Sequence, residues 1–132
     1  MLTYKEAIRF HGHDGPFLAL GFKAGRFILR NFIKNGETKL SCVVKLKMEK
    51  PFSCVIDGLQ CSTDLTIGKC NLKIEESYNE IPVFVCEDKK TGQKISFTIK
   101  EEIFKKAKNC KDLHKCASEI ISLDPSLLFV FI

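Results

Sequence analysis

The 132-residue sequence contains no tryptophan, two tyrosines and three histidines. It has no run of about 18 uncharged apolar residues, so no transmembrane helix is expected. Its first residues, MLTYKEAIRF, form an amphipathic segment rather than the charged and then apolar start of a signal peptide. No Cys-x-x-Cys pair occurs. The sequence therefore offers neither a membrane span nor the paired-cysteine spacing of a zinc finger.

Cysteine content and net charge limit the class of protein further. Seven cysteines, an odd number without a secretion signal, favour a reducing cytoplasm in which most cysteines are small buried apolar residues. The net charge of +5 is compatible with an anionic ligand but too small by itself to indicate nucleic acid, so nucleic-acid binding is the least supported function. The 45% apolar content and the length predict one globular domain, residues 1–132.

The pattern of apolar residues predicts an α+β fold. Strict alternation, as in KLSCVVKLKME, is typical of strands with one wet face, and Pro16 suits the first position of a long helix that Asn35-Gly36 would end. The expected helices are 2–9, 16–35, 52–61, 101–108 and 112–122, and the expected strands are 39–49, 70–76, 81–87 and 93–100. Together they predict a single domain with an about four-stranded, largely antiparallel sheet covered by helices.

The long predicted helix has two further features. Gly21 and Gly25 each cost about 1 kcal/mol relative to alanine in a helix interior, which predicts close approach by another backbone. Four basic residues share one stripe of the helix and are interpreted as a solvated face: Lys23, Arg26, Arg30 and Lys34.

The stretch His11-Gly-His13-Asp14 lies directly before this helix. Two imidazoles one residue apart can be directed at one point, and neutral imidazole suits divalent transition metals. The start of the helix at Pro16 also directs N–H groups toward the turn, which favours an anion there. The alternative is a pair of surface histidines in a loop.

A second group of polar residues occurs in SCVIDGLQC. In a helix, Cys54, Asp57 and Cys61 share one face with Gln60 on its flank, and a carboxylate on a helix that packs inward needs a partner. The alternative is a satisfied aspartate between two core cysteines. The following loop, STDLTIGKCN, offers hydroxyls and Lys69 to an anion or is a solvated turn. A grouping of Cys110, His114 and Cys116 is a poorer candidate for structural zinc.

Two of these stretches together resemble the family of proteins similar to the E-subunit of formylmethanofuran dehydrogenase. FHGHDGPFLALGFKAG is similar to the family motif His-Gly-His-x-Cys-Pro-x-Leu-Ala-Leu-Gly, and CVIDGLQCSTDLTIGKCNL to Cys-x-x-Asp-Gly/Ala-x-Gln followed by Thr-x-Gly-Lys-x-Asn-Leu. Gly15 stands where many members have the cysteine before proline, and the sequence lacks the C-terminal zinc module of some relatives. The resemblance implies an α+β core domain, often paired as a homodimer, with a metal-associated pocket made from both motifs.

Carried over to this sequence, the resemblance implies a pocket of His11, His13, Cys54, Asp57 and Gln60, with Thr66 and Lys69 nearby. The first hypothesis is a divalent transition metal, expected to be zinc, bound by His11, His13 and Cys54, with an open position for water or substrate. Asp57 and His13 are the expected catalytic groups. Gln60, Thr66 and Lys69 are expected to bind a cofactor or small anionic ligand.

The second hypothesis is a non-catalytic accessory protein. It would bind a partner in a tungsten or molybdenum formylmethanofuran dehydrogenase system, and so be linked to methanogenesis, as the family name suggests. The apolar end of the chain, residues 127–132, would then serve as an interface, or else dock on the chain's own core. The first hypothesis requires the imidazoles of the early turn to lie near Cys54 and Asp57.

Overall fold

Five strands form one mixed sheet in the computed structural model, which describes residues 1–32 and 39–132. They are β1 (Leu40–Leu46), β2 (Leu72–Glu76), β3 (Val83–Asp88), β4 (Lys94–Ile99) and β5 (Phe129–Phe131), in the spatial order β2-β1-β3-β4-β5. β1 pairs in parallel with β2, and the other neighbouring pairs are antiparallel. The α+β fold is confirmed: β1 to β4 are the four expected strands, and β5 is a short addition at the edge.

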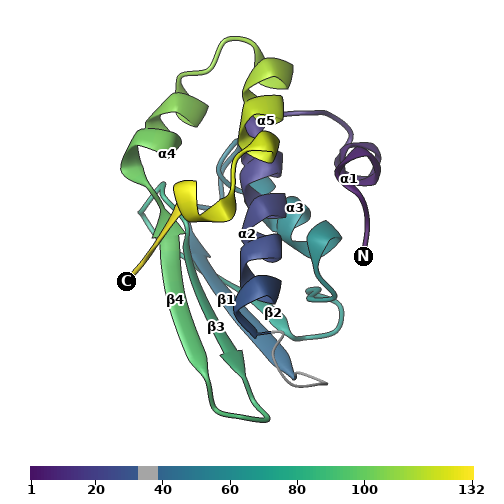
Figure 1. Ribbon diagram of the computed structural model, residues 1–132, viewed down its shortest axis with the longest axis vertical. Helices are drawn as coiled ribbons and strands as arrows, with labels where there is room; N and C mark the ends of the chain where they lie inside the picture. The colour runs from purple at the N-terminus through teal and green to yellow at the C-terminus, as the bar shows by residue number, and fades with distance from the viewer. Residues whose placement is uncertain (33–38) are drawn as a thin grey trace.

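The helices lie on one side of this sheet (Figure 1). They are α1 (Tyr4–His11), α2 (Pro16–Phe32), α3 (Cys54–Ser62), α4 (Glu101–Lys108) and α5 (Leu113–Ser122), followed by a short 3-10 turn, Pro125–Leu127. α2 runs along the sheet. In the view of Figure 1, α3 and then α1 lie to the right of α2, and α5 lies against the upper half of α2. The predicted helix stop at Asn35-Gly36 and Lys34 of the basic stripe lie outside the described residues.

A cluster of phenylalanines fills the space between α2 and the sheet. Phe84 and Phe97 are fully buried on neighbouring strands with ring centroids 4.8 Å apart. Phe27 of α2 packs edge-on against Phe97 at 4.9 Å. Phe129 of β5 closes the cluster, with its ring 5.3 Å from Phe97. Packing of Phe129 into this cluster explains why the last strand joins the sheet.

Close contact between α2 and α3 depends on glycine. A Cβ at Gly21 would overlap the backbone carbonyl of Val55, and one at Gly58 would overlap the backbone of α2 at Leu18. The predicted close approach is thus confirmed at Gly21, whereas at Gly25 the neighbour is the Ser62 side chain rather than another backbone. This contact holds α3, which carries Cys54 and Asp57, against the start of α2.

The basic stripe on α2 is not simply a solvated face. The Lys23 ammonium donates to the carbonyl oxygen of Ile121 at 3.1 Å, and burial lowers the pKa of this lysine. Arg30 donates two hydrogen bonds, 3.0 and 3.3 Å long, to the carboxylate of Asp124. Two of the four predicted surface charges therefore hold the C-terminal part of the chain to α2, a role that depends on contacts distant in sequence.

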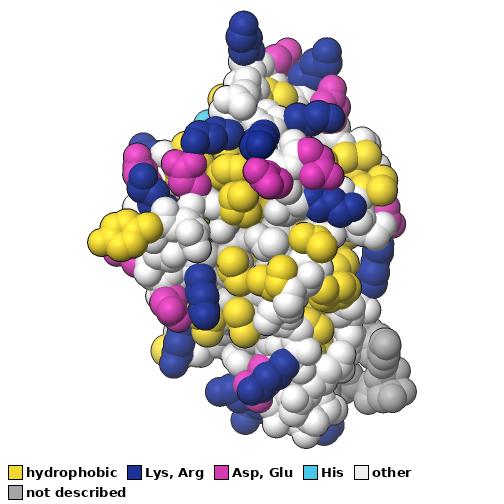
Figure 2. Space-filling model, turned by 90° about the vertical axis from the view of Figure 1, so that its left-hand side faces the viewer, with side chains coloured by type: hydrophobic (Ala, Val, Ile, Leu, Met, Phe, Trp, Pro, Cys, Tyr) yellow, Lys and Arg dark blue, Asp and Glu magenta, His cyan; other side chains and the backbone are white. Residues whose placement is uncertain are grey.

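The last residues of the chain, 128–132, lie partly in the core and partly on the surface. Leu128 and Phe129 are buried, whereas Val130, Phe131 and Ile132 are exposed. Val130 lines a groove of about 420 Å³ on the outer side of β3 and β4, together with Ile81, Val83 and Thr98. Figure 2 shows hydrophobic side chains across the middle of the side that carries α4, β4 and the C-terminus, with charged residues around them. Docking on the chain's own core is thus confirmed for Leu128 and Phe129, and an interface at the exposed residues stays a prediction.

The helices of the described residues are all too short or too polar to cross a membrane. This finding agrees with the expectation from the sequence.

Candidate functional site

The turn between α1 and α2 places the two histidines. α1 begins at a capping box in which Thr3 and Glu6 exchange side-chain and backbone hydrogen bonds, and it extends to His11, two residues beyond the predicted end. Gly12 ends the helix in the left-handed region, with φ of 101°, and its N–H donates to the carbonyl of Ile8. The chain then turns so that α2 begins at Pro16, as predicted. His11 is therefore held on a helix, and His13 lies in the turn.

His11 contacts Asp57 across the two helices. The ring Nδ1 lies 2.6 Å from the carboxylate Oδ2, and the imidazole is only 12% exposed while the Asp57 side chain is 37% exposed. Because an ionised carboxylate only accepts hydrogen bonds, Nδ1 is the donor. This pairing leaves Nε2 of a neutral His11 with an available lone pair. The contact joins the two sequence motifs, as the first hypothesis requires.

His13 and Cys54 meet in a neighbouring cavity. The His13 ring lies with its centroid 4.7 Å from that of His11. His13 and Cys54 both line a cavity of about 100 Å³ whose walls also include Gly15, Pro16 and Cys110. Burial, and then the negative charge of Asp57, raise the pKa of the Cys54 thiol. In the absence of a metal this thiol therefore stays protonated at neutral pH.

The polar groups are not already gathered into a metal centre. Among residues 1–32 and 39–132, no three His, Cys, Asp or Glu side chains lie where they could hold one ion. The structure brings together the pair His11 and Asp57, the neighbouring, tilted rings of His11 and His13, and the cavity that His13 shares with Cys54. These groups have the donor chemistry of a transition-metal site.

The three residues expected to bind a cofactor lie elsewhere, in and beside the loop after α3. The Gln60 side-chain oxygen accepts from the N–H of Ile67 at 3.0 Å, and the Thr66 hydroxyl accepts from the N–H of Lys69 at 3.1 Å. Neither Gln60, Thr66 nor Lys69 lines the cavity of His13 and Cys54. The polar side chains of Gln60 and Thr66 therefore stabilise the loop, and an anionic ligand at these residues stays a prediction.

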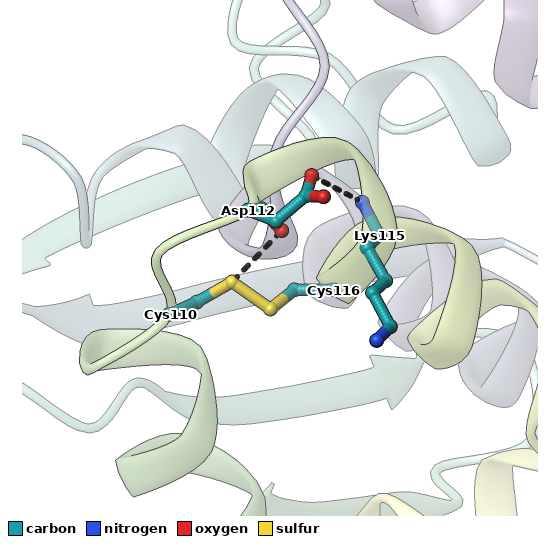
Figure 3. The surroundings of a disulfide bond; sticks show 4 residues. All are labelled: Cys110, Asp112, Lys115 and Cys116. Carbon is teal, nitrogen blue, oxygen red and sulfur yellow. Dashed lines mark hydrogen bonds between the residues drawn. A yellow bond between two sulfur atoms is a disulfide. The ribbon is translucent and has the colours of Figure 1, made fainter.

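Most of the free cysteines are buried, as expected, but two other cysteines form a disulfide. Cys61 packs in a small core cluster with Ala7 and Phe22 rather than facing the cavity with Cys54. Cys110 and Cys116 form a disulfide (Figure 3), so the grouping with His114 is not a zinc site, and not every cysteine is a reduced apolar residue. Among the described residues the free cysteines are Cys42, Cys54, Cys61, Cys70 and Cys86.

One polar network was not anticipated. Asp14 accepts a hydrogen bond from the Tyr4 hydroxyl at 2.5 Å, and its other oxygen lies 2.6 Å from Nδ1 of His114. Burial, and then the hydrogen bond and charge of Asp14, raise the pKa of Tyr4 well above its usual value. Asp14 stood beside His13 in the sequence motif, but nothing local indicated His114, which is 100 residues away. The network fixes the turn against α1 and α5.

A known protein family matches most of the chain. A family model described as "FmdE, Molybdenum formylmethanofuran dehydrogenase operon" matches residues 10–127. The chain belongs to the FmdE family. The match spans both motifs of the FmdE site, from the turn with His11 and His13 through α3 to α5. No curated protein matches the chain. The resemblance deduced from two short motifs thus holds for nearly the whole fold.

Proposed function

We propose that this FmdE-family protein binds a divalent transition metal, expected to be zinc, between the 11–15 turn and α3, with His11, His13 and Cys54 as ligands. The observation that carries the proposal is the 2.6 Å contact between His11 Nδ1 and Asp57 Oδ2. A carboxylate that accepts a hydrogen bond from one ring nitrogen and leaves the other unprotonated is the usual support of a metal-binding histidine.

The donor set suits such a metal. Two imidazole nitrogens and one thiolate are ligands that zinc accepts, and three protein ligands leave one position open. Since the three donors do not converge among the described residues, we expect binding to require rotation of the His13 and Cys54 side chains within their shared cavity. Loss of the Cys54 proton would accompany binding, because only the thiolate is a ligand.

Asp57 and His13 would have different roles at this site. Asp57 orients His11. Its carboxylate, which contacts the His11 ring, would also be able to take up a proton. His13, at the cavity wall, would hold or exchange a proton whenever it is not engaged as a ligand. When bound, the metal would supply Lewis-acid chemistry. A small anionic ligand would be drawn by the N-terminus of α2, where Gly15 and Pro16 line the cavity.

Metal titration of the stripped protein tests the proposal. We expect one zinc ion per chain, and affinity reduced by roughly tenfold or more in His11→Ala, His13→Ala and Cys54→Ala, as loss of a ligand or its support requires. Cys70→Ser is the matched control, because this free cysteine is exposed and does not line the cavity of His13 and Cys54. Binding well below one ion per chain, or equal affinity in all four variants, would overturn the proposal.

An accessory role is the second candidate. The observation that favours it is the groove of about 420 Å³ with Val83 and Val130 in its wall, beside an exposed apolar C-terminus. The operon in the family description suggests a component of a molybdenum or tungsten formylmethanofuran dehydrogenase as the occupant. Binding of the purified dehydrogenase that weakens in Val130→Lys and not in Lys73→Glu would support it. Self-association lost in the same variant would instead indicate the expected homodimer.

A further inference from the structure

The Cys110–Cys116 disulfide lies between two cavities. Cys110 lines the cavity of about 100 Å³ that also contains His13 and Cys54. Cys116 lines a different cavity, of about 90 Å³, with Ile103, Glu119 and Ile120. Cys110 and Cys54 therefore line the same small cavity. Only one of the two bridged cysteines therefore borders the proposed metal site.

The loop that carries Cys110 is held by hydrogen bonds as well as by the bridge. Asp112 caps α5 by accepting from the N–H of Lys115 at 3.1 Å (Figure 3). Its carbonyl accepts from the N–H of Cys116 at 3.0 Å. At the other end, the N–H of Asn109 donates to the carbonyl of Lys105 at 3.0 Å. Since none of these bonds involves the disulfide, cleavage of the bridge would leave Cys110 at the cavity wall.

The bridge is also open to attack. Both half-cystines are only partly buried. Cys116 lies in the first turn of α5, where the positive end of the helix dipole and the neighbouring Lys115 favour a thiolate. A leaving thiolate that is stabilised in this way makes exchange faster. Attack on the Cys110 sulfur, with Cys116 as the leaving group, is therefore the favoured route of reduction.

We propose that this disulfide is a redox gate on the metal pocket, in which reduction frees Cys110 to join Cys54 and His13 as a metal ligand. The inference rests on the proposed function. A dithiol reductant supplies two electrons and two protons, the Cys110–Cys116 bond breaks, two thiols form, and the reductant becomes a disulfide. Cys110 then loses its proton on binding the metal. While the bridge is intact, its sulfur cannot be a thiolate ligand.

Two thiolates and one imidazole form a softer donor set than one thiolate and two imidazoles. Such a set favours thiophilic ions such as Zn²⁺ and Co²⁺ over harder ones. The gate would thus make tight binding conditional on a reducing environment. His11, already paired with Asp57, would then orient the site from outside or complete a fourth position.

Two serine variants separate the gate from the mere loss of a disulfide. Neither Cys116→Ser nor Cys110→Ser can form the bridge, but only the first keeps the Cys110 thiol at the cavity. We expect oxidised wild type to bind Zn²⁺ at least about tenfold more weakly than reduced wild type. A loss of affinity of this size is typical when one metal ligand or its support is removed. Cys116→Ser should bind tightly with or without reductant, and Cys110→Ser weakly in both conditions. Circular dichroism checks that both variants fold.

Cobalt provides a second readout. Thiolate-to-Co²⁺ charge-transfer absorption should be stronger in Cys116→Ser than in Cys110→Ser, because one more thiolate binds the ion. Equal zinc affinity and equal absorption in the two variants would refute the gate, while loss of binding in His13→Ala and Cys54→Ala would still support the proposed function. Absence of binding by every reduced form would overturn both. Seven titratable thiols in unreduced, denatured protein, rather than five, would also refute the gate.

Discussion

Nδ1 of His11 lies 2.6 Å from Oδ2 of Asp57, across 46 positions of sequence. The histidine comes from the last residue of α1, and the aspartate from the first turn of α3. The glycine contacts between α2 and α3 set the position of α3 beneath the turn. The two motifs therefore come into contact because the helices pack closely.

The first prediction concerns this pair. Asp57→Asn should weaken zinc binding by roughly 10- to 100-fold, because the amide no longer fixes the His11 ring with the same charge and tautomer. Competition with a chromophoric chelator measures the affinity. Asp64→Asn, on the exposed loop after α3, is the control and should bind as wild type does. If the two variants bind equally well, Asp57 has no supporting role.

The second prediction concerns the contact between α2 and α3. Gly58→Ala should lower the free energy of unfolding by about 1–3 kcal/mol, because the new methyl group meets the α2 backbone, despite the better helix propensity of alanine. Urea denaturation gives the value. The control is Gly68→Ala, where no atom lies within 4 Å of the added Cβ. A Gly58→Ala protein as stable as the control would show that the helices separate easily.

Thiol reactivity provides the third prediction. Burial and the charge of Asp57 raise the pKa of Cys54, so its thiolate fraction near pH 8 is smaller than that of an ordinary cysteine, whose pKa is about 8.5. Iodoacetamide should therefore label Cys54 slowly and exposed Cys70 quickly, as peptide mass spectrometry can measure. The Cys54 rate should rise with pH, and should be faster in Asp57→Asn at the same pH. Equal rates at Cys54 and Cys70 would contradict this environment.

The fourth prediction separates the two parts of the C-terminal strand. Phe129→Ala should cost about 3–5 kcal/mol of stability, because its ring is buried against Phe97 and Phe27. Phe131→Ala should cost much less, since this ring is 55% exposed although it touches Phe27. Thermal or urea unfolding of the two variants compares them directly. Similar losses would mean that the strand acts as one unit.

The fifth prediction is the pH dependence of the Arg30–Asp124 pair. Hydrogen bonds from Arg30 hold the pKa of Asp124 below its usual value. A lowered folded-state pKa stabilises the protein above the ordinary carboxyl pKa of about 3.9, and this stability is lost as the pH falls through the lower folded value. Arg30→Met should therefore destabilise the protein at neutral pH.

The same measurement in acid provides the check. The difference in unfolding free energy between wild type and Arg30→Met should narrow as the carboxylate is protonated. It should also shrink in high salt, because both side chains are about half exposed. Arg26→Met is the control, since Arg26 lies over the Phe22 ring and its variant should show no such acid dependence. A gap that stays constant with pH would show that the ion pair contributes nothing.

Much of this protein follows from local sequence patterns. Alternation of apolar residues located β1 to β4 within about two residues at most ends, and Pro16 marked the start of α2. These features depend on the period of the backbone and on the fixed φ of proline, which act over a few residues. The polar motifs likewise indicated which side chains would form a site, and the FmdE family followed from them.

Tertiary structure decided how these pieces combine. It paired His11 with Asp57, joined Asp14 to His114, and bridged Cys110 to Cys116, which from the sequence were only a poor candidate for structural zinc. It also placed the loop of Thr66 and Lys69 away from the cavity that His13 and Cys54 line. Contacts between residues distant in the chain depend on the packing of helices against one sheet. Local spacing determines which face a side chain occupies, but only that packing determines what lies opposite it.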